Sequence, residues 1–407
     1  MYNYKTIASY SIFYWINTLC IFWFFLTLIP GYSRWATDTL AVISIFYLPV
    51  FLTRVKKSIQ PKNFLKPSTY WLISLISYGL VGIFRLYFSG EDDLSSYDRW
   101  FRFLLAGLLF LYLTKTRLNR GSIEYGVLFS LIVIFIYVVY ENPPGRLSLG
   151  YNQTTTGSIL AAYTCLALSV AFCKGPVYKK LIFIGGWAIG FYLTVRTGTR
   201  GAISAALIIS FGFLILVAFE NIKMALLVIM ILVLPAGIYM SNNKLVESRY
   251  QATITEIEKL KSGASYGSIG SRFKLWEVAI RLGNSSPLFG VGMDQSNAIS
   301  TYKELEPVNS LPSAVSNLPN FHSTYLEFYA KGGFILLATF LSLAISALYG
   351  VKKEAFMLIG SIVGVLLIAS VTDVVMYSGM YIMLIMVGVS SIRAAYQPMP
   401  NDMVSDS

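Results

Sequence analysis

The chain contains 407 residues, of which 56% are hydrophobic and only 13% are charged, and its formal net charge is +12. Because soluble domains carry about 25% charged residues, this composition excludes an ordinary water-soluble protein. The apolar runs are continuous rather than alternating, which excludes a membrane β-barrel and predicts membrane-spanning helices of about 20 residues.

Twelve apolar segments are candidate membrane spans, and charged residues separate them along the chain. The first segment is too long for the core of a signal peptide, so we expect it to be retained as an anchor. We therefore predict an all-α membrane protein with about 12 transmembrane helices. The predicted spans are 7–29, 36–53, 69–88, 100–114, 123–140, 156–173, 181–195, 202–219, 224–241, 333–350, 355–372 and 379–396.

The basic residues are concentrated in alternate connections between these spans. The connection after the second span holds five of them, from Arg54 to Lys66, and the connections after the fourth and sixth spans hold three each. Cytoplasmic connections of membrane proteins carry such an excess, so both termini are predicted to be cytoplasmic. The net charge largely reflects this bias, so membrane lipids are expected partners and nucleic acid is not.

One connection is much longer than the others and lies between the ninth and tenth spans, at residues 242–331. The orientation above places it outside the cytoplasm. We expect helices at Leu245–Leu260 and Ser271–Leu282, the second of them amphipathic with Ser271 as its N-cap. The predicted organisation is spans one to nine in 1–241, this helical loop in 242–331, spans ten to twelve in 332–398 and a disordered cytoplasmic tail in 399–407.

Basic residues at outer helix junctions are the candidates for chemistry. His322 is the only histidine and begins the helix that continues into the tenth span. Arg196 and Arg200 flank a glycine in TVRTGTRGAIS, and Arg272 follows the glycine-rich GSIGS. Arginine at a helix start opposes the helix dipole unless an anion binds there, and a phosphate meets that requirement. The alternatives are a surface histidine and arginines anchored at the membrane interface.

The order and topology of four short motifs suggest a family. The motifs are TGTRGA at 197–202, GSR at 270–272 followed by SPLFGVG at 286–292, and HSTYLE at 322–327 followed by Gly332 and Gly333. With the twelve predicted spans and the large outer loop, they resemble the O-antigen ligase and O-antigen polymerase superfamily. The resemblance implies a glycosyltransferase of the bacterial inner membrane with its active site in the periplasm, and it makes 242–331 a periplasmic catalytic loop.

Roles follow from the resemblance, position by position. Arg200 and Arg272 would bind the diphosphate of an undecaprenyl-diphosphate-linked O-antigen, and His322 would be the general base that activates the acceptor hydroxyl. Tyr325 and Glu327 would be accessory residues. Ser323 is a departure, since the family more often has asparagine after the histidine, and Arg196 has no assigned counterpart. An inverting transfer to lipid A core oligosaccharide is implied, with no cofactor.

The residues are compatible with a reaction that needs no metal ion. A base must deprotonate the attacking hydroxyl and positive charge must stabilise the leaving diphosphate, and one imidazole and two guanidinium groups are sufficient for both tasks. The only outer acidic cluster is Glu91, Asp92 and Asp93. The three cysteines all lie in apolar runs, so neither a disulfide framework nor a metal site is expected.

The acceptor decides between a ligase and a polymerase. Asp98, Arg99 and Arg102 at the start of the fourth span resemble the ligase pattern, and with Arg85 and Arg146 they are candidates for orienting an anionic core oligosaccharide. Interfacial anchoring is the alternative interpretation. The ligase is the favoured reading, and a polymerase that uses the same donor is the alternative. A flippase or other transporter is a more distant alternative, because transporters place ionisable groups near the midplane of the bilayer.

Overall fold

The computed structural model describes residues 4–28, 67–90, 94–114, 118–143, 145–219, 268–305 and 320–396, with isolated residues between 222 and 258. These residues form helices joined by turns, and no strand occurs among them. The predicted all-α class is therefore confirmed for the described parts of the chain.

Ten of the twelve predicted spans overlap described helices, while α12 and α13 lie in the long loop. Those predicted at 36–53 and 224–241 lie outside the described residues, apart from Leu226. The helices are α1 (Tyr4–Thr27), α3 (Pro67–Phe88), α4 (Leu94–Leu113), α5 (Arg120–Glu141), α6 (Gln153–Phe172), α7 (Val177–Arg196), α8 (Arg200–Ala218), α12 (Ser268–Ser285), α13 (Gln295–Leu305), α15 (Thr324–Leu348), α16 (Lys353–Ala369), η3 (Val375–Tyr377), α17 (Gly379–Met383), η4 (Leu384–Val389) and α18 (Ser390–Tyr396).

Among the residues that the structure describes, six helical segments are long and apolar enough to cross a membrane. They are Pro67–Phe88, Arg120–Glu141, Gln153–Phe172, Arg200–Ala218, Thr324–Leu348 and the run Gly379–Tyr396. The total of twelve spans stays a prediction.

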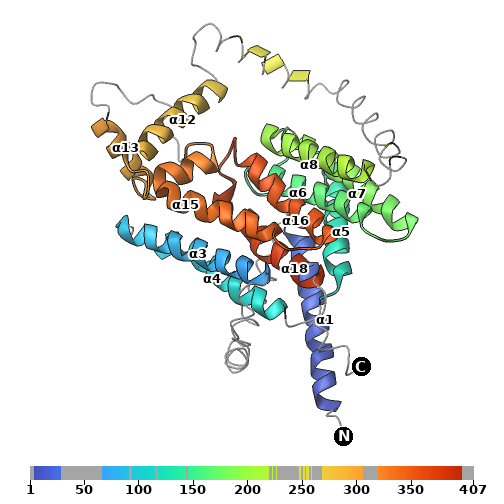
Figure 1. Cartoon of the computed structure of the whole chain (residues 1–407). Coiled ribbons are helices and arrows are strands. Elements are labelled where there is room, and N and C mark those ends of the chain that lie inside the picture. Colours follow the sequence, from blue (N-terminus) through green and yellow to red (C-terminus); the bar gives the residue numbers. More distant parts are fainter. Residues whose placement is uncertain are drawn as a thin grey trace.

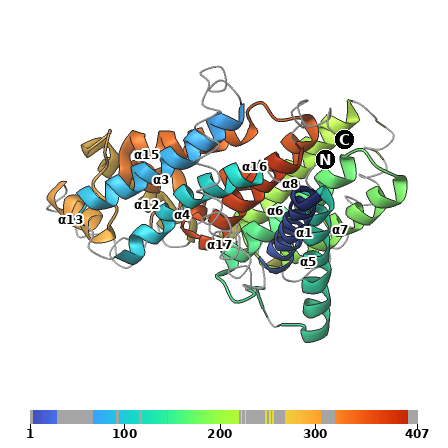
Figure 2. The same cartoon turned by 90° about the horizontal axis from the view of Figure 1, so that it is seen from below.

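The central helix of the bundle is α6, which Figures 1 and 2 show among α5, α7, α8 and α16. Every residue from Thr156 to Ala171 is buried. Small residues at its contacts bring the backbones close together: a Cβ at Gly190 of α7 would lie 2.6 Å from the Thr164 hydroxyl oxygen of α6. Membrane helices associate largely through such close packing, since lipid supplies little hydrophobic driving force between them.

A second group of helices, α3, α4 and α15, packs beside this centre (Figure 1). Gly82 of α3 admits the Trp100 side chain of α4, because a Cβ there would lie 2.0 Å from the indole ring. Tyr78 and Phe328 extend the aromatic contact into α15. These contacts join the α3–α4 pair to the helix that begins two residues after His322.

The helix ends form two separate polar groups, as expected for helices that alternate in direction. At the ends predicted to be cytoplasmic, Arg120 pairs with Glu354, and the Tyr396 hydroxyl donates to Glu124. Buried Arg393 donates to the carbonyls of Ser346 and Ala347 at the end of α15. The candidate site residues belong to the opposite ends.

The described part of the long loop packs against the start of α15. Helix α12 contains the predicted 271–282 segment but begins at Ser268, so Ser271 lies inside the helix and its prediction as an N-cap was wrong. A small core joins α12 and α13 to α15, and it includes Leu275, Leu282, Tyr302, Phe321 and Ala330. The predicted helix at 245–260 lies mostly outside the described residues.

Helix α15 is interrupted at Gly333, where φ is 65° and ψ is −167°. The SPLFGVG turn fills the interruption. The Phe334 N–H donates to the Pro287 carbonyl at 2.8 Å, and the Val291 N–H donates to the Ala330 carbonyl at 2.9 Å. The turn thereby satisfies backbone groups that the broken helix leaves without partners. Two motifs that are separate in the sequence thus form one structural unit.

Candidate active site

The TGTRGA motif forms the tight turn between α7 and α8. Gly198 has φ of +61°, and a Cβ there would lie 3.0 Å from the Arg146 Nε. Arg146 donates from Nε to the Thr197 carbonyl at 2.8 Å and from a terminal nitrogen to the Gly198 carbonyl at 3.3 Å. Glycine is therefore required at 198 both for the left-handed backbone and for the approach of Arg146. The turn ends where Arg200 begins α8.

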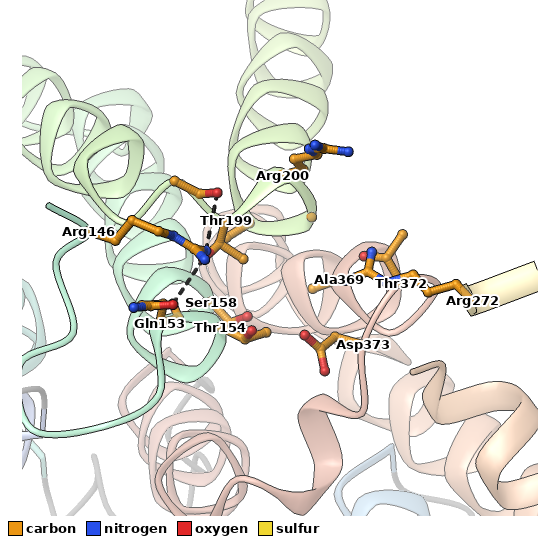
Figure 3. A pocket seen from close by; sticks show the side chains of 13 residues that line it. Arg146, Gln153, Thr154, Ser158, Thr199, Arg200, Arg272, Ala369, Thr372 and Asp373 are labelled. Atoms are coloured by element: carbon orange, nitrogen blue, oxygen red, sulfur yellow. Dashed lines mark hydrogen bonds between the residues drawn. The ribbon is translucent and has the colours of Figure 1, made fainter. Parts of the chain in front are cut away.

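A cavity of about 250 Å³ lies at this turn and is bounded by the starts of α6 and α8, by α12 and by the connection after α16. Figure 3 shows Arg200 reaching it from α8, Arg272 from α12 and Asp373 from the connection after α16. The lining residues are Arg146, Gln153, Thr154, Ser158, Gly198, Thr199, Arg200, Gly201, Ala202, Arg272, Ala369, Thr372 and Asp373. The two arginines predicted to act together thus share one cavity.

The charges around the cavity favour an anion. Three guanidinium groups, those of Arg146, Arg200 and Arg272, line it with a single carboxylate, that of Asp373. The N-termini of α6 and α8 add the positive ends of two helix dipoles. Thr199 precedes α8 without a side-chain capping bond to the helix. Arginines and helix N-termini together form the type of site that binds phosphate groups.

His322 lies beside this cavity rather than in its wall. Its backbone is left-handed, with φ of 52°, and its Nδ1 is buried without a hydrogen-bond partner in the described structure. Burial lowers the pKa of His322 below its usual value, and Arg272 lowers it further, while Asp373 and Glu327 act in the opposite direction. The imidazole is therefore within electrostatic reach of two cavity residues and favours the neutral form.

Residues 185–341 match the sequence model of a family described as O-antigen ligase. The predicted resemblance to this family is confirmed. An O-antigen ligase of Escherichia coli is 24% identical over 351 residues, which cover 81% of each chain. An uncharacterized protein of Haemophilus influenzae is 22% identical over 347 residues, which cover 81% of this chain and 83% of the relative.

The matched O-antigen ligase region holds Arg200, Arg272 and His322, whereas Arg146 and Asp373 lie outside it. The apolar helices and the similarity to these proteins together support a multi-pass membrane protein. The cavity therefore combines the matched segment with residues from the two ends of the chain that flank it.

Asp373 was not singled out in the sequence. It follows the apolar run of α16, and its side chain accepts a hydrogen bond from the Val374 N–H at 2.8 Å. Its carbonyl accepts from the N–H of Thr324, two residues after His322, at 3.1 Å. The sequence feature that could have identified Asp373 is a lone carboxylate at an outer helix end, which is the kind of position where the candidate arginines were found.

Two of the predicted accessory arginines are engaged with the backbone away from the cavity wall. Arg196 donates to the Pro143 carbonyl at 3.0 Å. Arg85 is buried, and it donates to the Lys331 carbonyl at 3.3 Å and the Gly290 carbonyl at 3.5 Å. Arg85 therefore fastens the SPLFGVG turn to α15. Neither residue is among those that line the cavity.

The residues at the start of the fourth predicted span also lie away from the cavity wall. Asp98 and Arg102 form an ion pair along α4, and both side chains are partly exposed. The Arg99 guanidinium lies 4.6 Å from the centre of the Tyr377 ring. That ring follows Asp373 in the same connection, so Arg99 reaches the site's periphery through a cation–π contact.

The two accessory residues of the HSTYLE motif are bonded within the helix bundle. The Tyr325 hydroxyl donates to the Leu367 carbonyl at 2.8 Å. Glu327 is fully buried and pairs with Lys331. Glu91, Asp92 and Asp93 lie outside the described residues, and no group of three potential metal ligands occurs among the residues described.

Proposed function

We propose that the chain is an O-antigen ligase, which transfers an O-antigen glycan from undecaprenyl diphosphate to lipid A core oligosaccharide at the periplasmic face of the inner membrane. The observation that carries the proposal is the shared cavity of Arg200 and Arg272, which belong to distant segments of the chain. A diphosphate needs several positive groups converging from different directions, and this cavity supplies them.

In this proposal the two arginines bind the donor diphosphate. Negative charge grows on the leaving diphosphate as its bond to the anomeric carbon breaks, and positive groups fixed in advance stabilise that charge. The α8 N-terminus acts in the same direction. No protein nucleophile is required, because the acceptor hydroxyl attacks the anomeric carbon directly from the opposite face. The anomeric configuration is then inverted.

His322 is the proposed general base. A base must be neutral before the reaction and must have a nitrogen available to receive the hydroxyl proton. Burial holds the pKa of His322 below its usual value, and its Nδ1 has no protein partner in the described structure. Asp373 stabilises the imidazolium that forms, since its negative charge raises the pKa of His322. Buried polar atoms without partners are uncommon and often mark functional sites.

A polymerase would use the same cavity for the same donor, with a second lipid-linked glycan as its acceptor. The ligase is favoured by the Asp98–Arg102 segment, which the sequence resemblance relates to ligases. A transporter is less compatible with the described structure, because the cavity residues come from helix ends and connections. Transporter sites usually lie near the bilayer midplane.

Deletion of the gene followed by analysis of lipopolysaccharide separates these functions. A ligase deletion is expected to leave lipid A core without O-antigen chains while lipid-linked polymer accumulates. Complementation with the wild-type gene should restore the chains, and complementation with His322→Ala should not. Lipid A core that carries single repeats in the deletion strain would instead identify a polymerase.

A further inference from the structure

Glu327 lies in the first turn of α15 with no exposed surface. A buried carboxylate is costly unless ion pairing and hydrogen bonds compensate for its lost hydration. Three donors meet it: the Phe321 N–H at 2.7 Å, the Tyr377 hydroxyl at 2.9 Å and the Lys331 ammonium at 2.6 Å. The carboxylate therefore joins the residue before His322, the next turn of α15 and the η3 segment after Asp373.

These contacts act on a strained part of the chain. A left-handed backbone is strained at a residue other than glycine and persists only where the surroundings enforce it. Before His322, Phe321 is held by Glu327 and is buried in the core with α12 and α13. After it, the Ser323 hydroxyl donates to the Ser370 carbonyl at 3.2 Å. The backbone of His322 is thus held on both sides.

We propose that Glu327, together with Lys331 and Tyr377, is the positioning network of His322. The network holds the strained backbone in the one conformation that places the imidazole beside Arg272 and Asp373. This inference rests on the proposed function, because positioning matters only if His322 is the base. None of the three residues needs to touch the substrate.

The position of the network supports this role over simple stabilisation of the helix. An ion pair that only stabilised α15 could lie on any face, as Glu277 and Arg281 do on the exposed face of α12. Glu327 instead reaches backwards to the N–H of Phe321, outside the helix. Its charge also raises the pKa of His322. The carboxylate therefore acts on both the geometry and the proton affinity of the imidazole.

The test compares Glu327→Gln with wild-type protein in purified form, using a lipid-linked donor and a lipid A core acceptor. The amide replaces one acceptor oxygen by a donor, so either Phe321 loses its acceptor or Lys331 and Tyr377 lose theirs. We expect kcat to fall about 10- to 100-fold, the range that follows from displacing a base by about 1 Å. KM for the donor should change less than about twofold, since the proposed diphosphate ligands are untouched.

The pH profile gives an independent readout. Removing the negative charge of Glu327 lowers the pKa of His322, so the acidic limb of kcat should move to lower pH. Glu277→Gln is the matched control, because it breaks an ion pair of the same spacing on the exposed face of α12. The control should retain the wild-type kcat and the wild-type position of the acidic limb of the pH profile. A purely structural role of Glu327 predicts less folded protein, with an unchanged kcat per folded molecule and an unchanged limb.

Tyr377→Phe decides the question if Glu327→Gln does not fold, since it removes one hydrogen bond and no charge. A fall in kcat of about threefold or more at constant KM supports positioning, and wild-type kinetics overturn it. His322→Ala separates this proposal from the proposed function. Full transfer by His322→Ala would refute the role of His322 as the base. If His322→Ala is inactive but Glu327→Gln and Tyr377→Phe both show wild-type kinetics, only the positioning network is refuted.

Discussion

At the scale of the residue, the proton affinity of His322 links its environment to its proposed role. Burial is the largest cause that lowers its pKa, Arg272 adds to it, and Asp373 and Glu327 oppose it. The pKa of His322 therefore reflects burial together with charges of both signs, one guanidinium group and two carboxylates.

The first prediction concerns pH. Since the pKa of His322 is lowered, its neutral form exists above a pKa that lies below the usual value of about 6.5. Transfer should therefore rise with pH through one acidic ionisation and then reach a plateau. Because His322 is the only histidine, NMR of histidine-labelled protein with a histidine-free tag reports this pKa directly. A midpoint above 6.5 would contradict the prediction.

Substitution should separate catalysis from donor binding. His322→Ala should abolish transfer while the donor still binds, whereas Arg200→Ala and Arg272→Ala should weaken donor binding about tenfold or more, as expected for lost charge-assisted hydrogen bonds. The affinity of each purified variant for the lipid-linked donor is measured in a binding assay. Arg281→Ala is the control, since Arg281 lies on the exposed face of α12 and outside the cavity wall. Equal donor affinity in all four variants would contradict the assignment.

A further prediction is that no divalent ion is needed, because guanidinium groups and helix N-termini supply the positive charge. Transfer by purified protein should be unchanged within about twofold after EDTA treatment. A requirement for added Mg²⁺ or Mn²⁺ would direct attention to Glu91, Asp92 and Asp93. The initial rate of glycan transfer is measured with and without the chelator.

The sequence identified part of this site because arginine and histidine are conspicuous at the ends of apolar runs. Arg200 and Arg272 were predicted to act together, and they share the cavity. Asp373 was missed, since a single carboxylate after an apolar run carries no periodic signal. Arg146 lines the cavity and also bonds the Thr197–Gly198 turn, and its role in orienting the acceptor stays a prediction. Such assignments depend on side-chain direction, which sequence spacing does not specify.

At the scale of the element, helix interruptions position the site. The length and periodicity of apolar runs predicted the helices well, because burial in a bilayer requires continuous apolar segments. They did not predict that α15 breaks at Gly333 or that the SPLFGVG turn fills the break. The break depends on contacts between segments far apart in the chain. Only the paired glycines after HSTYLE hinted at it.

Gly333→Ala is expected to damage this unit. Its φ of 65° and ψ of −167° lie in a region almost confined to glycine, which costs other residues about 1–3 kcal/mol. A Cβ would also lie 2.3 Å from the Leu288 backbone, which adds a clash. Thermal unfolding in detergent should show a lower stability of the variant, and proteolysis should show that the loop is cleaved more readily. Gly212→Ala in α8 is the control, because a Cβ there would meet nothing within 4 Å outside the adjacent backbone of its own helix and alanine favours a helix.

At the scale of the whole molecule, the alternation of helix direction determines which residues can form one site. Connections that contain the cavity residues follow α5, α7 and α16, while the Arg120–Glu354 pair and the Arg393 contacts join the opposite ends. The distribution of basic residues predicted the same two sets of ends from charge alone. Geometry and charge thus agree on the grouping, and the direction across the membrane stays a prediction.

Cysteine labelling tests that direction. Tyr140 at the end of α5 is 85% exposed and Tyr178 at the start of α7 is 67% exposed, so cysteine at either position should react readily. In a background without Cys20, Cys165 and Cys173, a membrane-impermeant maleimide should label Tyr140→Cys from the periplasm in cells with a permeable outer membrane. Tyr178→Cys should react only after the inner membrane is opened. The reverse pattern would place the cavity in the cytoplasm, where the proposed ligase cannot meet its periplasmic donor, and would refute the function even if every residue role were correct.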